Sequence, residues 1–107
     1  MAKIVWTEEF QEQLDSYIGN ASKEFGRSTA HRWAEQIAAI EHRLELFPAS
    51  YSPEYLLRGK DVLYRACQLM HRRFKLIYYY DETDDTVHLV DIWDTRMNPK
   101  ALIKRIK

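Results

Sequence analysis

The sequence predicts an α+β domain in which a helical hairpin covers one face of a four-stranded, mainly antiparallel sheet. Three observations lead to this class. Two long segments in the first half carry apolar residues at helical spacing, and three segments in the second half are rich in β-branched and aromatic residues. The breaks between those three segments are short, which favours an antiparallel meander over crossover connections. A chain of 107 residues accommodates one domain, so we expect residues 1–107 to form a single unit.

The first half of the chain predicts one strand and two helices. Residues 3–6 form the expected strand, and Thr7 followed by two glutamates supplies a helix N-cap with acidic residues in the first turn. Gly26 fits the end of that helix. Ser28 or Thr29 is then expected to cap a second helix.

The second half predicts a meander and a last short helix. Pro48 ends the second helix, and a loop is expected as far as residue 59. Strands are expected over residues 61–69, 74–81 and 86–93, and Asn98-Pro99 supplies the N-cap and first residue of the last helix. The order is strand, helix, helix, three strands, helix. We expect the hairpin to cover one face of the sheet and to leave the other face free.

Composition narrows the class of protein. Sixteen basic and sixteen acidic residues cancel, so the chain as a whole gives no reason to expect a membrane or nucleic-acid partner. The charge is uneven, however, with nine acidic and five basic residues in 1–57, a net charge of −4. Residues 58–107 have eleven basic and seven acidic residues, a net charge of +4, so an anion is expected to bind this half.

Cysteine usage and hydropathy indicate a cytoplasmic protein. Cys67 is the single cysteine, so it forms no internal disulfide, and no Cys/His grouping at metal-ligand spacing accompanies it. We therefore expect no metal and no other cofactor. The apolar stretch at residues 4–6 is too short for a signal peptide, and no later segment approaches the roughly 20 apolar residues of a membrane-spanning helix.

Arg65, Lys75 and Arg96 are candidates for a phosphate site on the predicted strands. Side chains alternate across a sheet. Three sets are therefore each expected to share a face: Leu63, Arg65 and Cys67; Lys75, Ile77 and Tyr79; His88, Val90, Ile92, Asp94 and Arg96. If the three cations converge on the free face, they can stabilise the charge that develops when a 2′-hydroxyl attacks an RNA phosphate, without a metal. The alternative is that they are solvated strand charges.

Several short motifs, in order along the chain, resemble one known family. They are Ile4-Val5-Trp6-Thr7, residues 44–48, Tyr64-Arg65, residues 74–81 (FKLIYYYD) and residues 87–96 (VHLVDIWDTR). Their order and spacing are similar to the strand, helical hairpin and three-strand plan of the RelE/ParE superfamily of bacterial toxins from type II toxin–antitoxin pairs. The resemblance spans nearly the whole chain. It implies a cognate antitoxin partner that wraps an extended or helical segment around the toxin.

The resemblance implies one of three activities. Members of the ribosome-dependent branch cleave mRNA in the ribosomal A site with basic residues that fall, by position, on Arg65, on Lys75 in place of the usual Arg, and on Arg96. Many of these nucleases place a Tyr or His after the last Arg, whereas residues 97–102 contain neither. The ParE-like branch inhibits DNA gyrase by binding it, and a degenerate member would bind only its antitoxin. The three retained basic positions favour the metal-independent endoribonuclease, which acts on mRNA on the ribosome.

Further residues are candidates for acid–base catalysis or for RNA binding. His71, in the turn before the second meander strand, either replaces the missing acid or base or is an exposed turn histidine. Tyr79 either stacks on a base or packs within the sheet. The remaining candidates form a diffuse RNA-attracting rim: Lys60, Arg72, Arg73 and Lys100.

Overall fold

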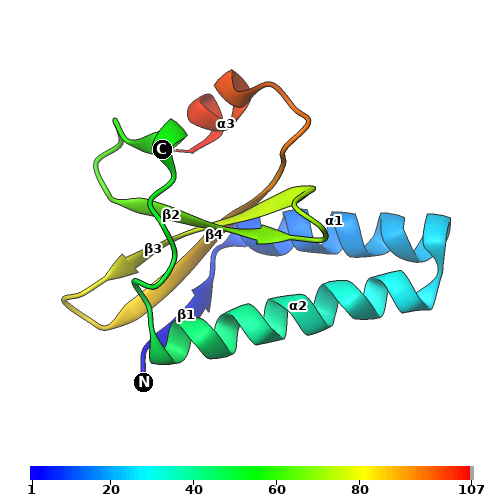
Figure 1. The fold of residues 1–107 in the computed structure, drawn as a ribbon, viewed down its shortest axis with the longest axis horizontal. Helices are drawn as coiled ribbons and strands as arrows, with labels where there is room; N and C mark the ends of the chain where they lie inside the picture. Colours follow the sequence, from blue (N-terminus) through cyan, green and yellow to red (C-terminus); the bar gives the residue numbers. More distant parts are fainter. Residues whose placement is uncertain (107) are drawn as a thin grey trace.

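The sheet lies between the helical hairpin on one side and a shorter helix on the other (Figure 1). The computed structural model describes residues 1–106. The elements are β1 (Lys3–Trp6), α1 (Glu8–Phe25), α2 (Arg27–Leu46), the 3₁₀ helix η1 (Tyr55–Leu57), β2 (Tyr64–Leu69), β3 (Phe74–Asp81), β4 (Thr86–Asp94) and α3 (Pro99–Arg105). The predicted order of elements is confirmed. None of the described helices combines the length and apolar character that crossing a bilayer requires.

Helix α1 begins and packs as its sequence predicts. The Thr7 hydroxyl accepts a hydrogen bond from the Phe10 amide at 3.2 Å, which satisfies one of the free N–H groups of the first turn. The same hydroxyl donates to the Leu89 carbonyl of β4 at 2.9 Å. Phe10 and Leu14 are buried one helical turn apart, on the side that contacts the sheet. The cap therefore both starts the helix and fixes it against β4.

The turn between the two helices differs from the prediction. Helix α2 begins at Arg27, directly after Gly26, so the expected caps Ser28 and Thr29 lie inside its first turn. Gly26 has a φ of 86°, a conformation that glycine adopts without steric cost. One glycine thus ends α1 and precedes α2, and α2 starts without a side-chain cap. The prediction that Ser28 or Thr29 caps the helix is wrong, because the chain reverses direction at Gly26 and α2 begins at the next residue.

The sheet has the strand order β1-β4-β3-β2. β1 pairs with β4 in parallel, and the β2–β3 and β3–β4 pairs are antiparallel. This confirms a four-stranded, mainly antiparallel sheet. β2 begins at Tyr64, three residues later than predicted, and residues 61–63 belong to the preceding loop.

A bulge in β4 changes which side chains share a face. The register between β3 and β4 shifts at Ile77/Tyr78, so Val90 has no direct partner across the strands. An extra residue of this kind interrupts the alternation of side chains. The set predicted to share one face is therefore divided: His88 and Val90 lie on one side of the sheet, and Ile92 and Asp94 lie on the other.

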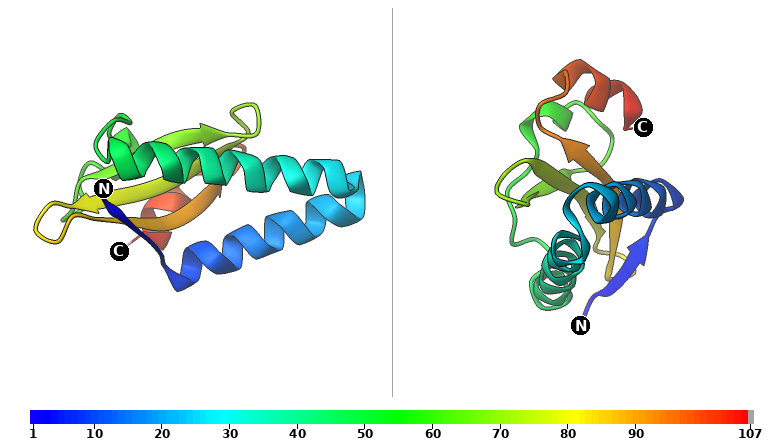
Figure 2. Two further views of the ribbon diagram at one scale, coloured as in Figure 1. Left: turned by 90° about the horizontal axis from the view of Figure 1, so that it is seen from below. Right: turned by 90° about the vertical axis from the view of Figure 1, so that its right-hand side faces the viewer.

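Each face of the sheet has its own hydrophobic core. The larger core lies between the sheet and the helical hairpin and includes Trp33, Leu44 and Tyr78. The smaller core lies on the opposite face, where Leu102 of α3 packs with Trp93. The views in Figure 2 show α3 and the hairpin on opposite sides of the strands. The prediction that the second face is free is wrong, because α3 and η1 bury apolar side chains there.

An ion pair attaches α3 to the sheet. The Arg105 guanidinium donates to both carboxylate oxygens of Asp91, through Nε at 2.9 Å and through Nη2. Asp91 is 1% exposed, so loss of the arginine would leave a buried carboxylate without its cation. Such a loss typically costs about 3 kcal/mol or more. The pair therefore holds the cover of the second face in place.

Candidate functional site

A cavity of about 530 Å³ lies where the far end of the helical hairpin meets the β2–β3 turn and the end of β4. Its lining combines aromatic, basic and acidic side chains. The site depends on seven of the lining residues: Tyr17, Trp33, His71, Arg73, Phe74, Asp94 and Arg96. The mixture of an apolar wall and a few polar groups is typical of binding sites.

Three aromatic rings form the apolar wall. Tyr17 of α1 stacks on Trp33 of α2, with ring centroids 5.6 Å apart and planes inclined by 8°. Phe74, the first residue of β3, lies with its ring centroid 4.7 Å from that of Tyr17 and 4.8 Å from that of Trp33. Burial raises the pKa of the Tyr17 hydroxyl. Each ring therefore contacts the other two.

Arg96 is held over the cavity by Asp94. Its Nε and Nη2 atoms donate to the two carboxylate oxygens at 3.2 and 3.0 Å. These hydrogen bonds lower the pKa of Asp94. The Arg96 side chain is nevertheless 63% exposed, so the outer edge of the guanidinium stays available to a ligand.

The β2–β3 turn brings two more basic residues to the cavity. Met70, His71 and Arg72 have φ angles of 50°, 57° and 68°, a left-handed conformation that costs non-glycine residues roughly 1–2 kcal/mol each. The Met70 amide donates to the Gln36 side chain at 2.8 Å, and the Thr95 amide donates to the Arg73 carbonyl at 3.0 Å. The turn is thus fixed to both α2 and the end of β4. His71 and Arg73 line the cavity as a result.

The three predicted catalytic cations do not converge. Arg65 pairs with Tyr78 across β2 and β3, which places it on the hairpin face, and its Nη1 donates to the Tyr51 carbonyl at 2.7 Å. Lys75 lies on the opposite face, where its Nζ is 2.9 Å from the carboxylate of Glu54. Arg96 lies at the cavity. The condition for a shared phosphate site, that the three cations converge on one free face, is not met, because strand alternation separates Arg65 from Lys75 and the second face is covered.

The predicted rim is also distributed over the molecule. The Lys60 ammonium donates to the Ile103 carbonyl of α3 at 2.6 Å, and Lys100 is exposed on α3. Arg72 is exposed in the β2–β3 turn beside the cavity. Tyr79 does share a face with Lys75, but its ring stacks on His88 with centroids 4.6 Å apart. Of the residues proposed from sequence, the cavity gathers His71, Arg73 and Arg96.

Sequence reasoning missed the acidic partners of Lys75 and Arg96. Glu54, placed in a loop, is 7% exposed because it binds Lys75 and also accepts a hydrogen bond from the Leu56 amide at 3.2 Å. Glu54 is the N-cap residue of η1, and an acidic side chain at a helix N-terminus was the available signal. The Asp94–Arg96 pair had a signal too, since an acid two residues before a strand-end arginine lies within its reach.

Comparison with known proteins gives a consistent family assignment. Residues 4–99 match the family model described as ParE toxin of type II toxin–antitoxin system, parDE. A search of curated proteins finds no matching relative. Among solved structures, the chain is similar to the chromosomal ParDE toxin–antitoxin system from P. aeruginosa, with a TM-score of 0.66, 14% identity, and coverage of 88% of this chain and 96% of that chain.

Two further structures share the fold. A metal-bound toxin from Helicobacter pylori has a TM-score of 0.65 and 18% identity, covering 90% of this chain and 97% of that chain. The intact E. coli RelBE toxin–antitoxin complex contains a chain with a TM-score of 0.60 and 13% identity, covering 89% of this chain and 98% of that chain. The fold and the family model agree with the motifs described above. The chain belongs to the ParE toxin family of type II toxin–antitoxin systems, within the RelE/ParE superfamily.

Proposed function

We propose that this toxin acts by binding a target protein, with DNA gyrase as the target, and that it does not cleave RNA. A type II toxin has a cognate antitoxin, and the family assignment establishes that pairing. The ParE-like branch is the one for which the resemblance implied gyrase inhibition. The proposal reverses the order in which the sequence placed the two activities.

The separation of the three basic residues carries this proposal. A metal-independent nuclease needs preorganised cations that face one developing charge. Here Arg65 donates to a backbone carbonyl, and Lys75 is paired with a buried carboxylate on the other side of the sheet. Arg96 is paired with Asp94. Each of the three cations is bound to its own acceptor, so these three side chains do not form a cluster that could bind one phosphate.

The cavity supports binding to a protein. Interface residues that contribute most to affinity are enriched in Trp, Tyr and Arg around a pocket. This cavity is lined by Tyr17 and Trp33 together with Arg73 and Arg96, and because Trp33 is only 3% exposed, the half-buried Tyr17 offers more of the accessible ring surface. A segment of the target that carries an apolar side chain beside a carboxylate would contact both the aromatic wall and the guanidinium groups.

One observation favours the nuclease as a second candidate. His71 lines the same cavity as Arg73 and Arg96, so an imidazole and two guanidinium groups border one space. A histidine there can transfer a proton while the arginines bind a phosphate. The catalytic set would then be His71, Arg73 and Arg96, with Arg65 and Lys75 outside it.

The two activities are separated by adding the purified full chain to two reactions. In the first, gyrase supercoils relaxed plasmid, and cleaved plasmid is measured after denaturation. In the second, a translation extract reads a defined message whose cuts are mapped by primer extension. We expect inhibited supercoiling with trapped cleavage complexes and an intact message.

Cuts in the translated message without an effect on gyrase would instead assign the nuclease activity. If neither reaction changes, while the chain still binds the antitoxin encoded beside it, the degenerate alternative holds. A chain preincubated with that antitoxin is the control, since it should be inactive in both reactions.

A further inference from the structure

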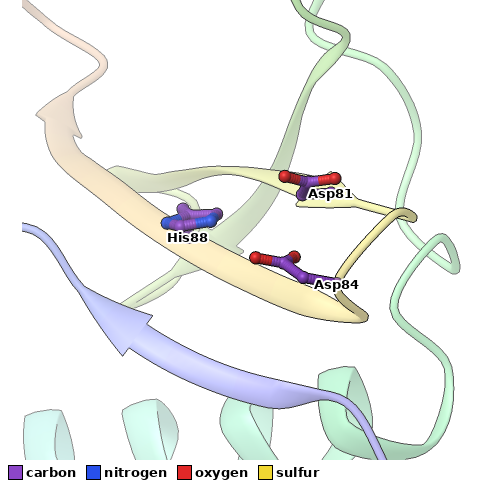
Figure 3. Close-up of side chains that lie close together, drawn as sticks. All are labelled: Asp81, Asp84 and His88. Atoms are coloured by element: carbon purple, nitrogen blue, oxygen red, sulfur yellow. The ribbon is translucent and has the colours of Figure 1, made fainter.

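A second group of side chains lies at the opposite end of β3 from the cavity. Asp81 ends β3, Asp84 is in the β3–β4 turn, and His88 is in β4 (Figure 3). One ligand atom from each of these residues lies within 4.8 Å of the other two. None of the three lines the cavity described above. The group is therefore separate from the candidate functional site.

We propose that Asp81, Asp84 and His88 form a binding site for a divalent transition-metal ion of the Zn²⁺ or Ni²⁺ kind. One imidazole nitrogen and two carboxylate oxygens are a donor set suited to these ions, whereas Mg²⁺ and Ca²⁺ prefer oxygen alone. The histidine comes from a different strand than the first aspartate. An ion at this position would therefore join the two strands of the hairpin.

The geometry needs only a small adjustment. Ligand atoms around Zn²⁺ lie at about 2.0–2.2 Å from the ion, which places them roughly 3–3.5 Å from one another. The three atoms here are within 4.8 Å of one another, so the approach needed is at most roughly 1–2 Å. Asp84 is exposed in the turn and can rotate to do so. Figure 3 shows its carboxylate lying between the turn and the imidazole.

Asp81 and His88 are already oriented. The Oδ1 atom of Asp81 accepts hydrogen bonds from the Thr83 amide at 3.0 Å and the Thr83 hydroxyl at 2.6 Å, which fix the orientation of the carboxylate. The His88 imidazole stacks on the Tyr79 ring, with centroids 4.6 Å apart and planes inclined by 14°. Groups that orient metal ligands in this way contribute to metal affinity. Tyr79 thus has a positioning role here.

The surrounding charge favours a cation. Four carboxylates lie within five positions of this turn: Asp81, Glu82, Asp84 and Asp85. Among residues 1–106, none of these four forms an ion pair with a lysine or arginine. The turn therefore has uncompensated negative charge, which attracts cations in general. The His88 imidazole adds a nitrogen ligand, which favours transition-metal ions at this site.

Titration calorimetry of the full-length, tag-free chain with Zn²⁺ tests the proposal, and Mg²⁺ serves as the comparison ion. We expect one equivalent of Zn²⁺ to bind, a rise in the melting temperature with Zn²⁺ concentration, and much weaker binding of Mg²⁺. His88→Gln and Asp84→Asn should each weaken Zn²⁺ binding by at least roughly tenfold. Circular dichroism should show that both variants remain folded.

Two matched variants are the controls. Glu82→Gln removes the same charge from the same turn, and His42→Gln removes an exposed histidine from α2. Glu82→Gln should weaken Zn²⁺ binding far less than Asp84→Asn does, and His42→Gln should keep the affinity of the parent chain. The proposal is overturned if the parent binds no Zn²⁺, if His88→Gln keeps the parent affinity, or if Mg²⁺ binds as tightly as Zn²⁺. It is also overturned if Glu82→Gln weakens binding as much as Asp84→Asn, because that result indicates diffuse attraction to the turn.

Discussion

Arg96 combines a fixed orientation with an exposed guanidinium, which makes it the residue that tests the cavity most directly. Arg96→Ala should weaken inhibition of the target by roughly tenfold or more, since arginines at the edge of an aromatic pocket contribute strongly to affinity. Arg96→Lys should recover only part of it, because lysine keeps the charge and loses the planar fork. The measurement is the concentration of chain that halves gyrase supercoiling.

Arg32→Ala is the matched control for this prediction. It removes an exposed arginine from α2 that does not line the cavity. Folding should be unchanged in both alanine variants, because each lost side chain is exposed. Equal activity of a folded Arg96→Ala protein and the parent would remove Arg96 from the binding site.

Cys67 and Tyr78 make the stability sensitive to alkaline pH. Burial raises the pKa of the Cys67 thiol to about 12 and that of the Tyr78 hydroxyl to about 12. Both groups stay protonated in the folded chain, whereas an exposed thiol ionises near pH 9 and an exposed tyrosine near pH 10. Their contribution to stability is therefore fully present below pH 9 and is lost as the pH rises towards 12.

We expect the free energy of unfolding to fall by an amount on the order of a few kcal/mol between pH 9 and pH 12. Urea titrations over this range measure it. Cys67→Ala should make the decline shallower, whatever its effect on stability at neutral pH. A thiol reagent at pH 8 should react with Cys67 only after unfolding. Rapid modification of the native protein would show that the thiol is accessible and would contradict this account.

At the scale of elements, the β2–β3 turn holds strain next to the cavity. Three consecutive non-glycine residues have positive φ angles there. Arg72→Gly and His71→Gly should each stabilise the fold by about 1 kcal/mol, since glycine adopts this conformation without a steric penalty. Only His71→Gly should weaken the inhibition of gyrase supercoiling, because His71 lines the cavity and Arg72 does not.

The two glycine variants control for each other. Both relieve the same kind of strain in the same turn, so chemical denaturation should show similar gains in stability. If Arg72→Gly lowers activity as much as His71→Gly, the turn acts through its conformation or net charge. His71 would then not contribute to target binding through its imidazole.

Sequence alone predicted most of the elements, because their signals are local. The periodicity of α1 and α2, the Thr7 and Asn98 caps and the β-branched strands are all properties of neighbouring residues. The alternation of polar and apolar residues slips by one at Leu89-Val90, but the bulge there was missed because two adjacent apolar residues also fit a strand buried on both faces. The packing of α3 and η1 on the second face was missed because the apolar side of a helix does not indicate which surface of the protein it packs against.

The candidate site was predicted only in part, because it depends on contacts between residues that are distant in the sequence. Arg96 and His71 were singled out, but their convergence depends on a turn that Gln36 and Thr95 hold in place from other elements. Lys75 was assigned to a phosphate because its buried partner, Glu54, lies twenty-one positions away. The Asp81, Asp84 and His88 group spans a hairpin, so its spacing gains meaning only once the strand register is known.

At the scale of the whole molecule, one sheet separates two cores. Leu76 faces the larger core and Ile77 the smaller one, and both residues are in β3. Loss of the sheet would therefore expose both cores together. A single domain of this size usually unfolds in one cooperative step. The arrangement predicts that the α3 side does not unfold separately from the hairpin side.

Tryptophan placement allows a direct test, because Trp33 is in the larger core and Trp93 in the smaller one. One variant keeps only Trp33, with Trp6→Phe and Trp93→Phe, and the other keeps only Trp93, with Trp6→Phe and Trp33→Phe. Within each variant, the urea transition followed by fluorescence should coincide with the one followed by far-ultraviolet circular dichroism. The Asp91–Arg105 pair supports this expectation, since it fixes α3 to a central strand. A Trp93 transition at lower urea than the circular dichroism transition would mean that α3 separates first and that the second face opens while the hairpin remains folded.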